Sequence, residues 1–176
     1  VIGQQTGNSA AIAIKHPDLK PGQLLLESLF VVECLAPRKL NVARFLPPTP
    51  IRILLDANGK RWDRLISCDD LLANAQGLET QAILPVISSY KEQIREVNRQ
   101  AEAAAQSSVE PIMDSALNTM MAHYTEEIQR MMALKKHNPG IREEEIQLMQ
   151  EQGLELHRHL QAARVRLDAV RLVISL

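Results

Sequence analysis

The sequence predicts an α+β fold, in which a mostly antiparallel sheet carries a protruding antiparallel helical hairpin and a third long helix. Three observations favour this class. Residues 1–66 contain short β-like runs, residues 83–168 repeat apolar side chains at helical spacing, and residues 170–176 return to a β-like pattern. We expect 1–66 to be the strand-rich part, 67–82 a connecting segment, and 83–176 the helical hairpin, third helix and closing strand of one structural unit.

The first part of the chain contains three strand signals. Residues 10–14 alternate larger and smaller apolar side chains, as a half-buried strand does. Residues 24–35 (LLLESLFVVECL) are apolar on both faces, which is typical of a strand covered on both sides. Residues 51–56 alternate again, and the following Asn58-Gly59 predicts a type I′ turn, so residues 60–66 should return as the second arm of a hairpin.

From residue 83 the apolar period changes to alternating spacings of three and four, which predicts helices. The first covers 83–108, and Pro85 fits it only in the first turn. A second helix covers 109–137 and is stopped by Asn-Pro-Gly, and a third covers 142–168. We expect the alanine-rich turns around 101–105 to form a hairpin tip that stands clear of the core.

Composition narrows the class of protein. The 176 residues carry a net charge of −1, so no overall field would attract the chain to nucleic acid or to a membrane, and no apolar run approaches the ~20 residues that span a bilayer. Cys34 and Cys68 are too few for a disulfide framework, and we expect both to be small buried thiols in a reducing cytoplasm. The opening VIGQQTGNSA is not a signal peptide and lacks Met, so we expect a segment of a longer protein.

No motif for catalysis, cofactor binding or metal binding is recognisable. The one Gly-Lys pair, Gly59-Lys60, lies in the predicted turn without the second glycine of a phosphate-binding loop, so we expect this segment to bind no ATP. His157 and His159 point to different faces of a helix, and no Cys-x-x-Cys is present. A small hydrolase whose site converges from distant residues is the weakest alternative.

One charge asymmetry is a candidate for binding. Residues 38–64 contain seven basic side chains against Asp56 and Asp63, a net charge of +5. Such a patch could face phosphates or an acidic protein surface, and its alternative interpretation is a solvated rim. Its aromatic residue could stack on a partner or belong to the core. The candidate interaction rim consists of Arg38, Lys39, Arg44, Lys60, Arg61, Trp62 and Arg64.

Four strings in this order resemble the terminal segment of one bacterial family. LKPGQLLLESLFVVECLAP (19–37), FLPPTPIRILLDANG (45–59), NPGIREEEI (138–146) and RLDAVRLVIS (166–175) are similar to the carboxy-terminal region of the RapA family. These proteins are Swi/Snf-type, helicase-like ATPases that bind core RNA polymerase and recycle it by ATP hydrolysis. The resemblance covers essentially the whole chain, and it implies that the motor motifs lie upstream of this segment.

The resemblance implies a non-catalytic accessory or interaction domain in transcription. Its partners would be core RNA polymerase and the motor domains of the longer protein, in cytoplasmic, nucleoid-associated transcription complexes. A weak contact with nucleic acid is a further interpretation, and no membrane contact is expected. The alternative from a different class is a coiled-coil-like scaffold or dimerisation module, built on the helical seams, that does not contact polymerase.

Overall fold

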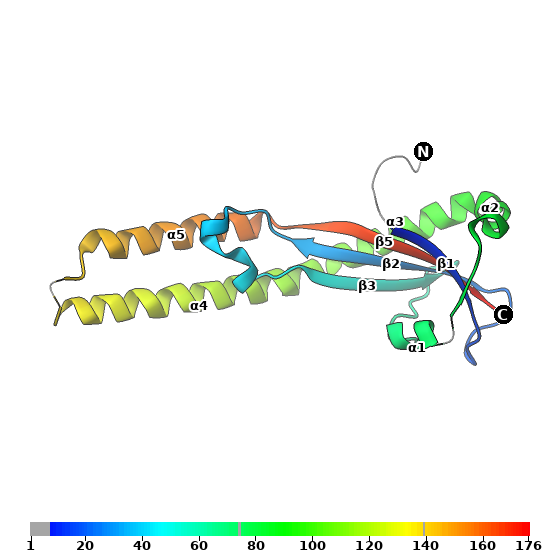
Figure 1. Cartoon of the computed structure of the whole chain (residues 1–176), viewed down its shortest axis with the longest axis horizontal. Helices are drawn as coiled ribbons and strands as arrows, with labels where there is room; N and C mark the ends of the chain where they lie inside the picture. The colour runs from blue at the N-terminus through cyan, green and yellow to red at the C-terminus, as the bar shows by residue number, and fades with distance from the viewer. Residues whose placement is uncertain (1–7, 74, 139) are drawn as a thin grey trace. The chain divides into compact units, whose positions relative to one another are not determined.

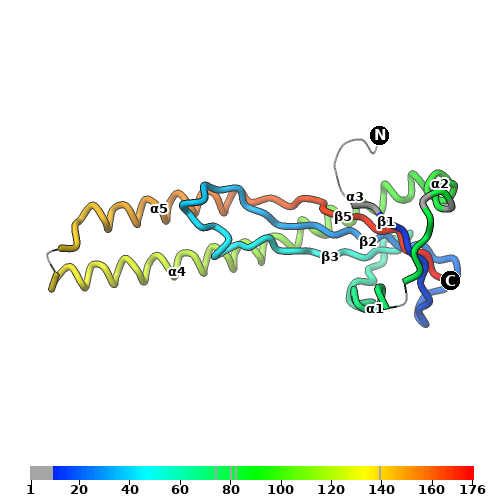
Figure 2. Tube along the Cα trace, in the orientation of Figure 1, coloured from blue at the N-terminus to red at the C-terminus, as the bar shows by residue number. Residues whose placement is uncertain are grey.

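A computed structural model describes residues 8–73, 75–138 and 140–176, and it confirms the α+β class (Figure 1 and Figure 2). The chain forms two compact units, each assembled from segments that are distant in the sequence. The sheet unit contains the chain up to Val31 together with Pro50–Ser107 and Arg166–Leu176. The hairpin unit contains Val32–Thr49 and Ser108–Val165.

Five strands form one mixed sheet in the order β3-β2-β5-β1-β4. Strand β2 runs opposite to its neighbours β3 and β5 (Figure 1), β1 is parallel to β5, and β1 is antiparallel to β4. The parallel pair joins the first and last strands of the chain, so the long crossover that parallel strands need is the whole sequence between them. The bounds are β1 Asn8–Ile14, β2 Leu24–Glu33, β3 Thr49–Asp56, β4 Gln76–Gly77 and β5 Arg164–Ser175.

The predicted type I′ turn after β3 is wrong. Gly59 has a φ of 79°, but Asn58 is not among the described residues with positive φ, whereas a type I′ turn needs both. The side-chain carboxylate of Asp56 instead accepts the backbone N–H of Asn58 at 2.9 Å and that of Lys60 at 3.0 Å. The predicted second arm, 60–66, contributes only an isolated bridge to β3, because the chain turns inward at Trp62.

Three helices complete the sheet unit. α1 (Cys68–Ala73) lies in the predicted connecting segment, and Ser67 and Asp70 cap its start by bonding each other's backbone N–H at 2.9 and 3.0 Å. The single predicted helix over 83–108 is wrong, since the chain forms α2 (Thr80–Ser89) and α3 (Lys91–Ser107). Pro85 lies inside α2, beyond its first turn.

The side chains along each strand point alternately to the two buried faces of the sheet. One face packs on α1 and the segment before it, and the other lies on α3, where Val97 approaches Leu26 of β2. The α1 side forms a core of nine buried apolar residues: Ile12, Ile14, Leu19, Leu25, Leu54, Trp62, Ile66, Leu71 and Val173.

The alanine-rich turns do not stand clear of the core. Ala101 and Ala105 of α3 are fully buried, which contradicts the prediction that they form a hairpin tip. Alanine's small side chain lets a helix approach its neighbours closely, so the same composition suits a buried helix face.

The helical hairpin is formed by α4 (Val109–Lys135) and α5 (Glu143–Gln161) of the hairpin unit. Met120, Leu156 and Leu160 of the predicted seams are buried there. The prediction that the third helix continues to residue 168 is wrong, because α5 ends at Gln161 and β5 begins at Arg164. The residues after α5 also alternate in period two, and strand pairing across β5 satisfies their backbone groups.

Candidate interaction surface

The structure divides the predicted rim between the two units. Lys60, Arg61 and Arg64 follow β3 in the sheet unit, and all three side chains are exposed. Arg61 forms a two-bond ion pair with Asp63, with Nε–Oδ1 at 3.0 Å and Nη2–Oδ2 at 2.8 Å. The charge that this part of the rim offers to a partner is therefore smaller than the sequence suggests, because one of its cations is already paired.

Trp62 belongs to the core of the sheet unit. Its side chain is only 5% exposed, and its Nε1–H donates to Oδ2 of buried Asp56 at 3.0 Å. Lys60 Nζ lies 4.2 Å from the centre of the indole ring and covers it in a cation–π contact. The indole ring therefore packs between the core and Lys60, and it is not accessible to a partner.

The ion pair with Arg61 shifts the pKa of the Asp63 carboxylate. Burial pushes its pKa upward, but the hydrogen bond and charge of Arg61, with backbone donors, outweigh burial and hold the pKa below its usual range. The same hydrogen bond to Asp63 raises the pKa of Arg61. The pair therefore stays charged at neutral pH.

Arg38, Lys39 and Arg44 lie in the hairpin unit, on two consecutive 3₁₀ turns (Arg38–Leu40 and Val42–Arg44). Buried Leu40 anchors these turns, and Asn41 joins them with a φ of 45°. The three basic side chains are exposed. The structure thus brings three rim residues together here and the other four in the sheet unit.

Contacts with α5 fix the segment that leads into these turns. Lys39 Nζ lies 3.1 Å from Glu155 Oε2, and the Cys34 thiol donates to the carbonyl of His159 at 3.0 Å. His159 Nδ1 lies 3.0 Å from the carbonyl oxygen of Leu35. Burial raises the pKa of the Cys34 thiol, which suits a protonated donor. The prediction that both cysteines are buried is wrong, because Cys34 is half-buried and Cys68 is exposed at the start of α1.

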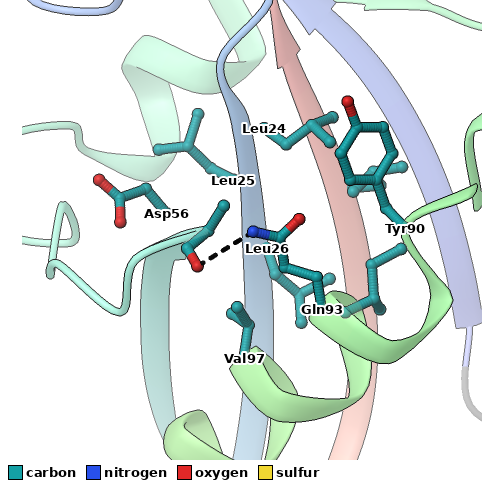
Figure 3. A pocket seen from close by; sticks show the side chains of 10 residues that line it. Leu24, Leu25, Leu26, Asp56, Tyr90, Gln93 and Val97 are labelled. Atoms are coloured by element: carbon teal, nitrogen blue, oxygen red, sulfur yellow. Dashed lines mark hydrogen bonds between the residues drawn. The ribbon is translucent and has the colours of Figure 1, made fainter.

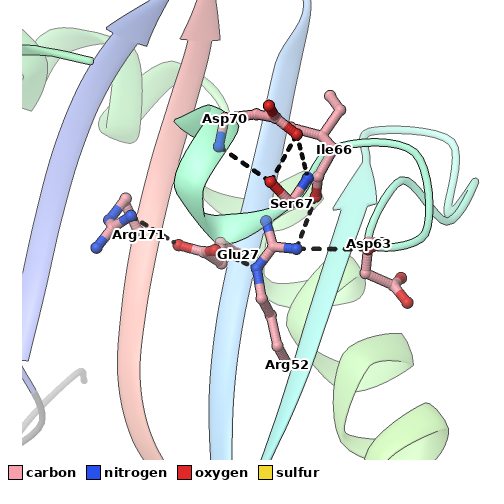
Figure 4. Close-up of polar contacts among 7 residues, drawn as sticks. All are labelled: Glu27, Arg52, Asp63, Ile66, Ser67, Asp70 and Arg171. Carbon is pink, nitrogen blue, oxygen red and sulfur yellow. Dashed lines mark hydrogen bonds and ion pairs between the residues drawn. The ribbon is translucent and has the colours of Figure 1, made fainter. Parts of the chain in front are cut away.

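Sequence reasoning missed a row of charges across three adjacent strands (Figure 4). Glu27 of β2, 6% exposed, accepts from Arg52 Nε of β3 at 2.6 Å, and Arg171 Nη1 of β5 lies 3.1 Å from its other oxygen. Arg52 Nη1 also donates to the carbonyl of Ile66 at 2.7 Å. The row therefore ties the segment before α1 to the sheet. The available signal was a glutamate inside an otherwise apolar strand, which must find a partner when buried.

A small cavity and a surface groove among the described residues are both lined mostly by apolar side chains. A cavity of about 20 Å³ between the sheet and α3 has room for about one water molecule (Figure 3). It is lined by apolar side chains such as Leu24 and Val97, and Gln93 at its edge lies 3.5 Å from the carbonyl of Ala57. A groove of about 340 Å³ in the hairpin unit has no titratable lining residue; its lining is Phe45, Leu46, Pro47, Thr49, Pro111, Ile112, Ser115 and Ala116.

The described residues contain neither a metal-binding cluster nor a membrane-spanning helix. No group of three or more His, Cys, Asp or Glu side chains in this part of the chain could hold a metal ion. No described helix is long and apolar enough to cross a membrane.

Comparison with known proteins gives a consistent result. The family described as the RNA polymerase recycling family C-terminal region matches residues 1–175. A protein of Sodalis glossinidius named RNA polymerase-associated protein RapA is 32% identical over 99% of this chain. A protein of the same name from Yersinia pestis is 30% identical over 99% of this chain. The chain spans 18% of the length of each of these curated relatives.

Proposed function

Because the chain belongs to the C-terminal region of the RNA polymerase recycling family, we propose that it is a non-catalytic accessory domain through which a longer protein associates with core RNA polymerase. The family match over residues 1–175 carries this proposal. ATP binding and hydrolysis then belong to the motor domains of the longer protein, which the chain would also contact. The setting would be cytoplasmic, nucleoid-associated transcription complexes.

The exposed cations of the sheet unit are the first candidates for the contact. Lys60 and Arg64 are exposed beside a turn that Asp56 fixes, so their backbone positions are defined before binding. Exposed charges contribute little to folding. Reversing Lys60 and Arg61 also removes the cation–π contact with Trp62 and the ion pair with Asp63, so the fold of the variant is checked by circular dichroism before binding is measured. Acidic protein surfaces and the nucleic acid held by polymerase both complement such charges.

The test is a titration of core RNA polymerase with the chain and with a triple variant, Lys60→Glu, Arg61→Glu and Arg64→Glu. We expect the variant to bind at least tenfold more weakly, with the loss largest at low salt. The matched control is the same charge change on the hairpin unit, at the exposed or half-buried Arg130, Lys135 and Lys136. Absence of polymerase binding by the unmodified chain would refute the proposed function, whereas equal losses in both variants would refute the specific rim.

A dimerisation module is the second candidate, and exposed apolar side chains on α4 favour it. Met121, Met132 and Leu134 are 53%, 46% and 49% exposed. Sedimentation velocity over a hundredfold dilution separates the two functions. A dimer that persists on dilution and does not bind polymerase would support the scaffold instead of the accessory domain.

A further inference from the structure

Asn58-Gly59 is the one Asn-Gly pair in the sequence, and it lies in the turn that follows β3. In such a pair the backbone nitrogen of the glycine can approach the asparagine side chain closely, because glycine has no Cβ to obstruct it. Asn58 is exposed to solvent. The pair therefore combines the reacting groups and the access to water that deamidation of asparagine needs.

Deamidation consists of a cyclisation and a hydrolysis, and water is its co-reactant. The Gly59 nitrogen gives up its proton and attacks Cγ of Asn58. An N–Cγ bond forms, the bond from Cγ to the side-chain NH₂ breaks, and the NH₂ group leaves with that proton as ammonia. Water then opens the succinimide ring. Aspartate results where the N–Cγ bond breaks, and isoaspartate, whose main chain passes through Cγ, results where the original peptide bond breaks.

The folded turn opposes the cyclisation. The Gly59 N–H donates to the backbone carbonyl of Asp56 at 2.9 Å, so the proton that must leave is held in a hydrogen bond. The Asp56 carboxylate accepts the N–H groups on both sides, from Asn58 at 2.9 Å and from Lys60 at 3.0 Å. One residue thus fixes three consecutive backbone nitrogens. The Gly59 nitrogen can turn toward Cγ only when these hydrogen bonds open.

Helix α3 restrains the same turn from outside. Gly59 lies so close to Gln100 that a Cβ at residue 59 would collide with Oε1 of that side chain. Gln93 Nε2 lies 3.5 Å from the carbonyl of Ala57, and residues 93 and 100 share one face of the helix. A succinimide ring, or the additional main-chain atom of isoaspartate, would displace Gly59 from this position. The contact with α3 therefore also favours the unreacted turn.

We propose that Asn58 is the principal deamidation site of this chain, and that the turn held by Asp56 restricts the reaction to molecules in which the turn is open. Opening of a turn is fast compared with bond rearrangement, so the rate follows the population of the open turn. The product places a carboxylate two residues before Lys60, where the sheet unit exposes its cations. This chemistry holds whether or not those cations bind polymerase.

The experiment follows one peptide while the full chain is incubated at physiological temperature and mildly alkaline pH. Trypsin releases residues 53–60 (ILLDANGK), in which Asn58 is the only side-chain amide, and mass spectrometry measures the fraction converted to acid. We expect the native chain to convert at least tenfold more slowly than the same chain unfolded in guanidinium chloride. Asn58→Gln is the chemical control. In the unfolded chain it should convert at least tenfold more slowly than Asn58, since its cyclisation needs a larger ring.

Two variants separate opening of the turn from unfolding of the whole sheet unit. Asp56→Ala removes the carboxylate that fixes the turn and should raise the native rate at least fivefold. The matched control is Ile14→Ala, which empties a fully buried site in the same core, on a strand separated from β3 by β2 and β5. It should stay within twofold. Circular dichroism verifies the fold of both variants.

Three results would overturn the proposal. Equal conversion in the native and unfolded chains would show that the turn gives no protection. Absence of conversion in the unfolded chain would show that Asn58 is not a deamidation site. Equal acceleration by Asp56→Ala and Ile14→Ala would show that conversion follows unfolding of the sheet unit. Where Asp56→Ala does not fold, Ile14→Ala decides alone, and an acceleration beyond twofold in that variant counts against the turn.

Discussion

Gly153 of α5 lies so close to Tyr124 of α4 that a Cβ at residue 153 would stand 3.1 Å from Cδ1 of the ring. That ring cannot move aside freely, because Phe45 and His123 pack around it with ring centres 6.3 and 5.5 Å away. Glycine therefore permits the close approach of the two helices at this point.

Replacing this glycine should destabilise the hairpin unit even though glycine is a poor helix former. Leucine has a helix propensity better by up to about 1 kcal/mol, but Gly153→Leu must displace the ring of Tyr124, and overpacking costs about 1–3 kcal/mol. We expect a lower free energy of unfolding in urea. In a Tyr124→Ala background the same change should stabilise, because the obstructing ring is gone. A stabilising effect with Tyr124 present would show that the helices separate easily.

Leu160 tests the predicted seam of the third helix. It lies mid-seam in the sequence and is fully buried in the structure. Leu160→Ala should lower the free energy of unfolding by about 2–5 kcal/mol, because it removes buried apolar area and leaves a cavity. Leu154→Ala on the same helix is the control, and it should cost well under about 1 kcal/mol because that side chain is 61% exposed. Equal costs at the two positions would mean that α5 does not pack through this seam.

The periodic elements were predictable because burial has a period. The run 24–35 and the seams of α4 and α5 repeat at strand or helix spacing, and each element exists. The end of α5 was not predictable from the sequence. Leu167 fits both the helical seam and the strand alternation, and only pairing within the sheet decides between the two structures. The type I′ turn predicted at Asn58-Gly59 was also wrong, because the Asp56 side chain supplies hydrogen-bond acceptors that turn propensities do not include.

The candidate surface was predictable in composition but not in arrangement. Counting charges finds Arg61, but only the fold shows that Asp63 pairs with it. Leu35 reads as the last residue of a buried strand, yet β2 ends at Glu33 and Leu35 is exposed. Glu27, Arg52 and Arg171 come from three strands that are far apart in the sequence and adjacent in the sheet, so their row depends on the strand order.

Asp56 should be a key residue of the sheet unit. Its carboxylate is 4% exposed and accepts from Asn58 N, Lys60 N and Trp62 Nε1. Asp56→Ala leaves these donors without their acceptor, and we expect a loss of about 1.5–3 kcal/mol in the free energy of unfolding, since each bond has a charged partner. Trp62→Phe keeps the hydrogen bonds from the amides of Asn58 and Lys60 to Asp56. It should therefore lower the exchange protection of these two amides less than Asp56→Ala does, and amide exchange can measure the difference. Unchanged protection of these amides in Asp56→Ala would contradict the role of the side chain.

The Arg61–Asp63 pair gives a pH dependence with a definite sign. The pKa of Asp63 is lowered in the folded chain, so the stabilisation it contributes is fully present above its unfolded pKa of about 3.9 and is lost as pH falls through the folded pKa. Arg61→Gln removes the hydrogen bond and charge that oppose the effect of burial. The pKa of Asp63 should then rise, and the acid-unfolding midpoint should move to higher pH.

Carboxyl ¹³C titration by NMR measures this pKa directly. The control is Arg99→Gln, which should raise the pKa of its own partner Glu96 from about 2, because the hydrogen bond from Arg99 is the main cause of that low value. It should leave Asp63 unchanged, since the two pairs share no residue. If Arg61→Gln left the pKa of Asp63 below its ordinary range, the backbone donors alone would be responsible. Arg61 would then be available to a partner at little cost, and its contribution to the rim would have to be counted as a free charge.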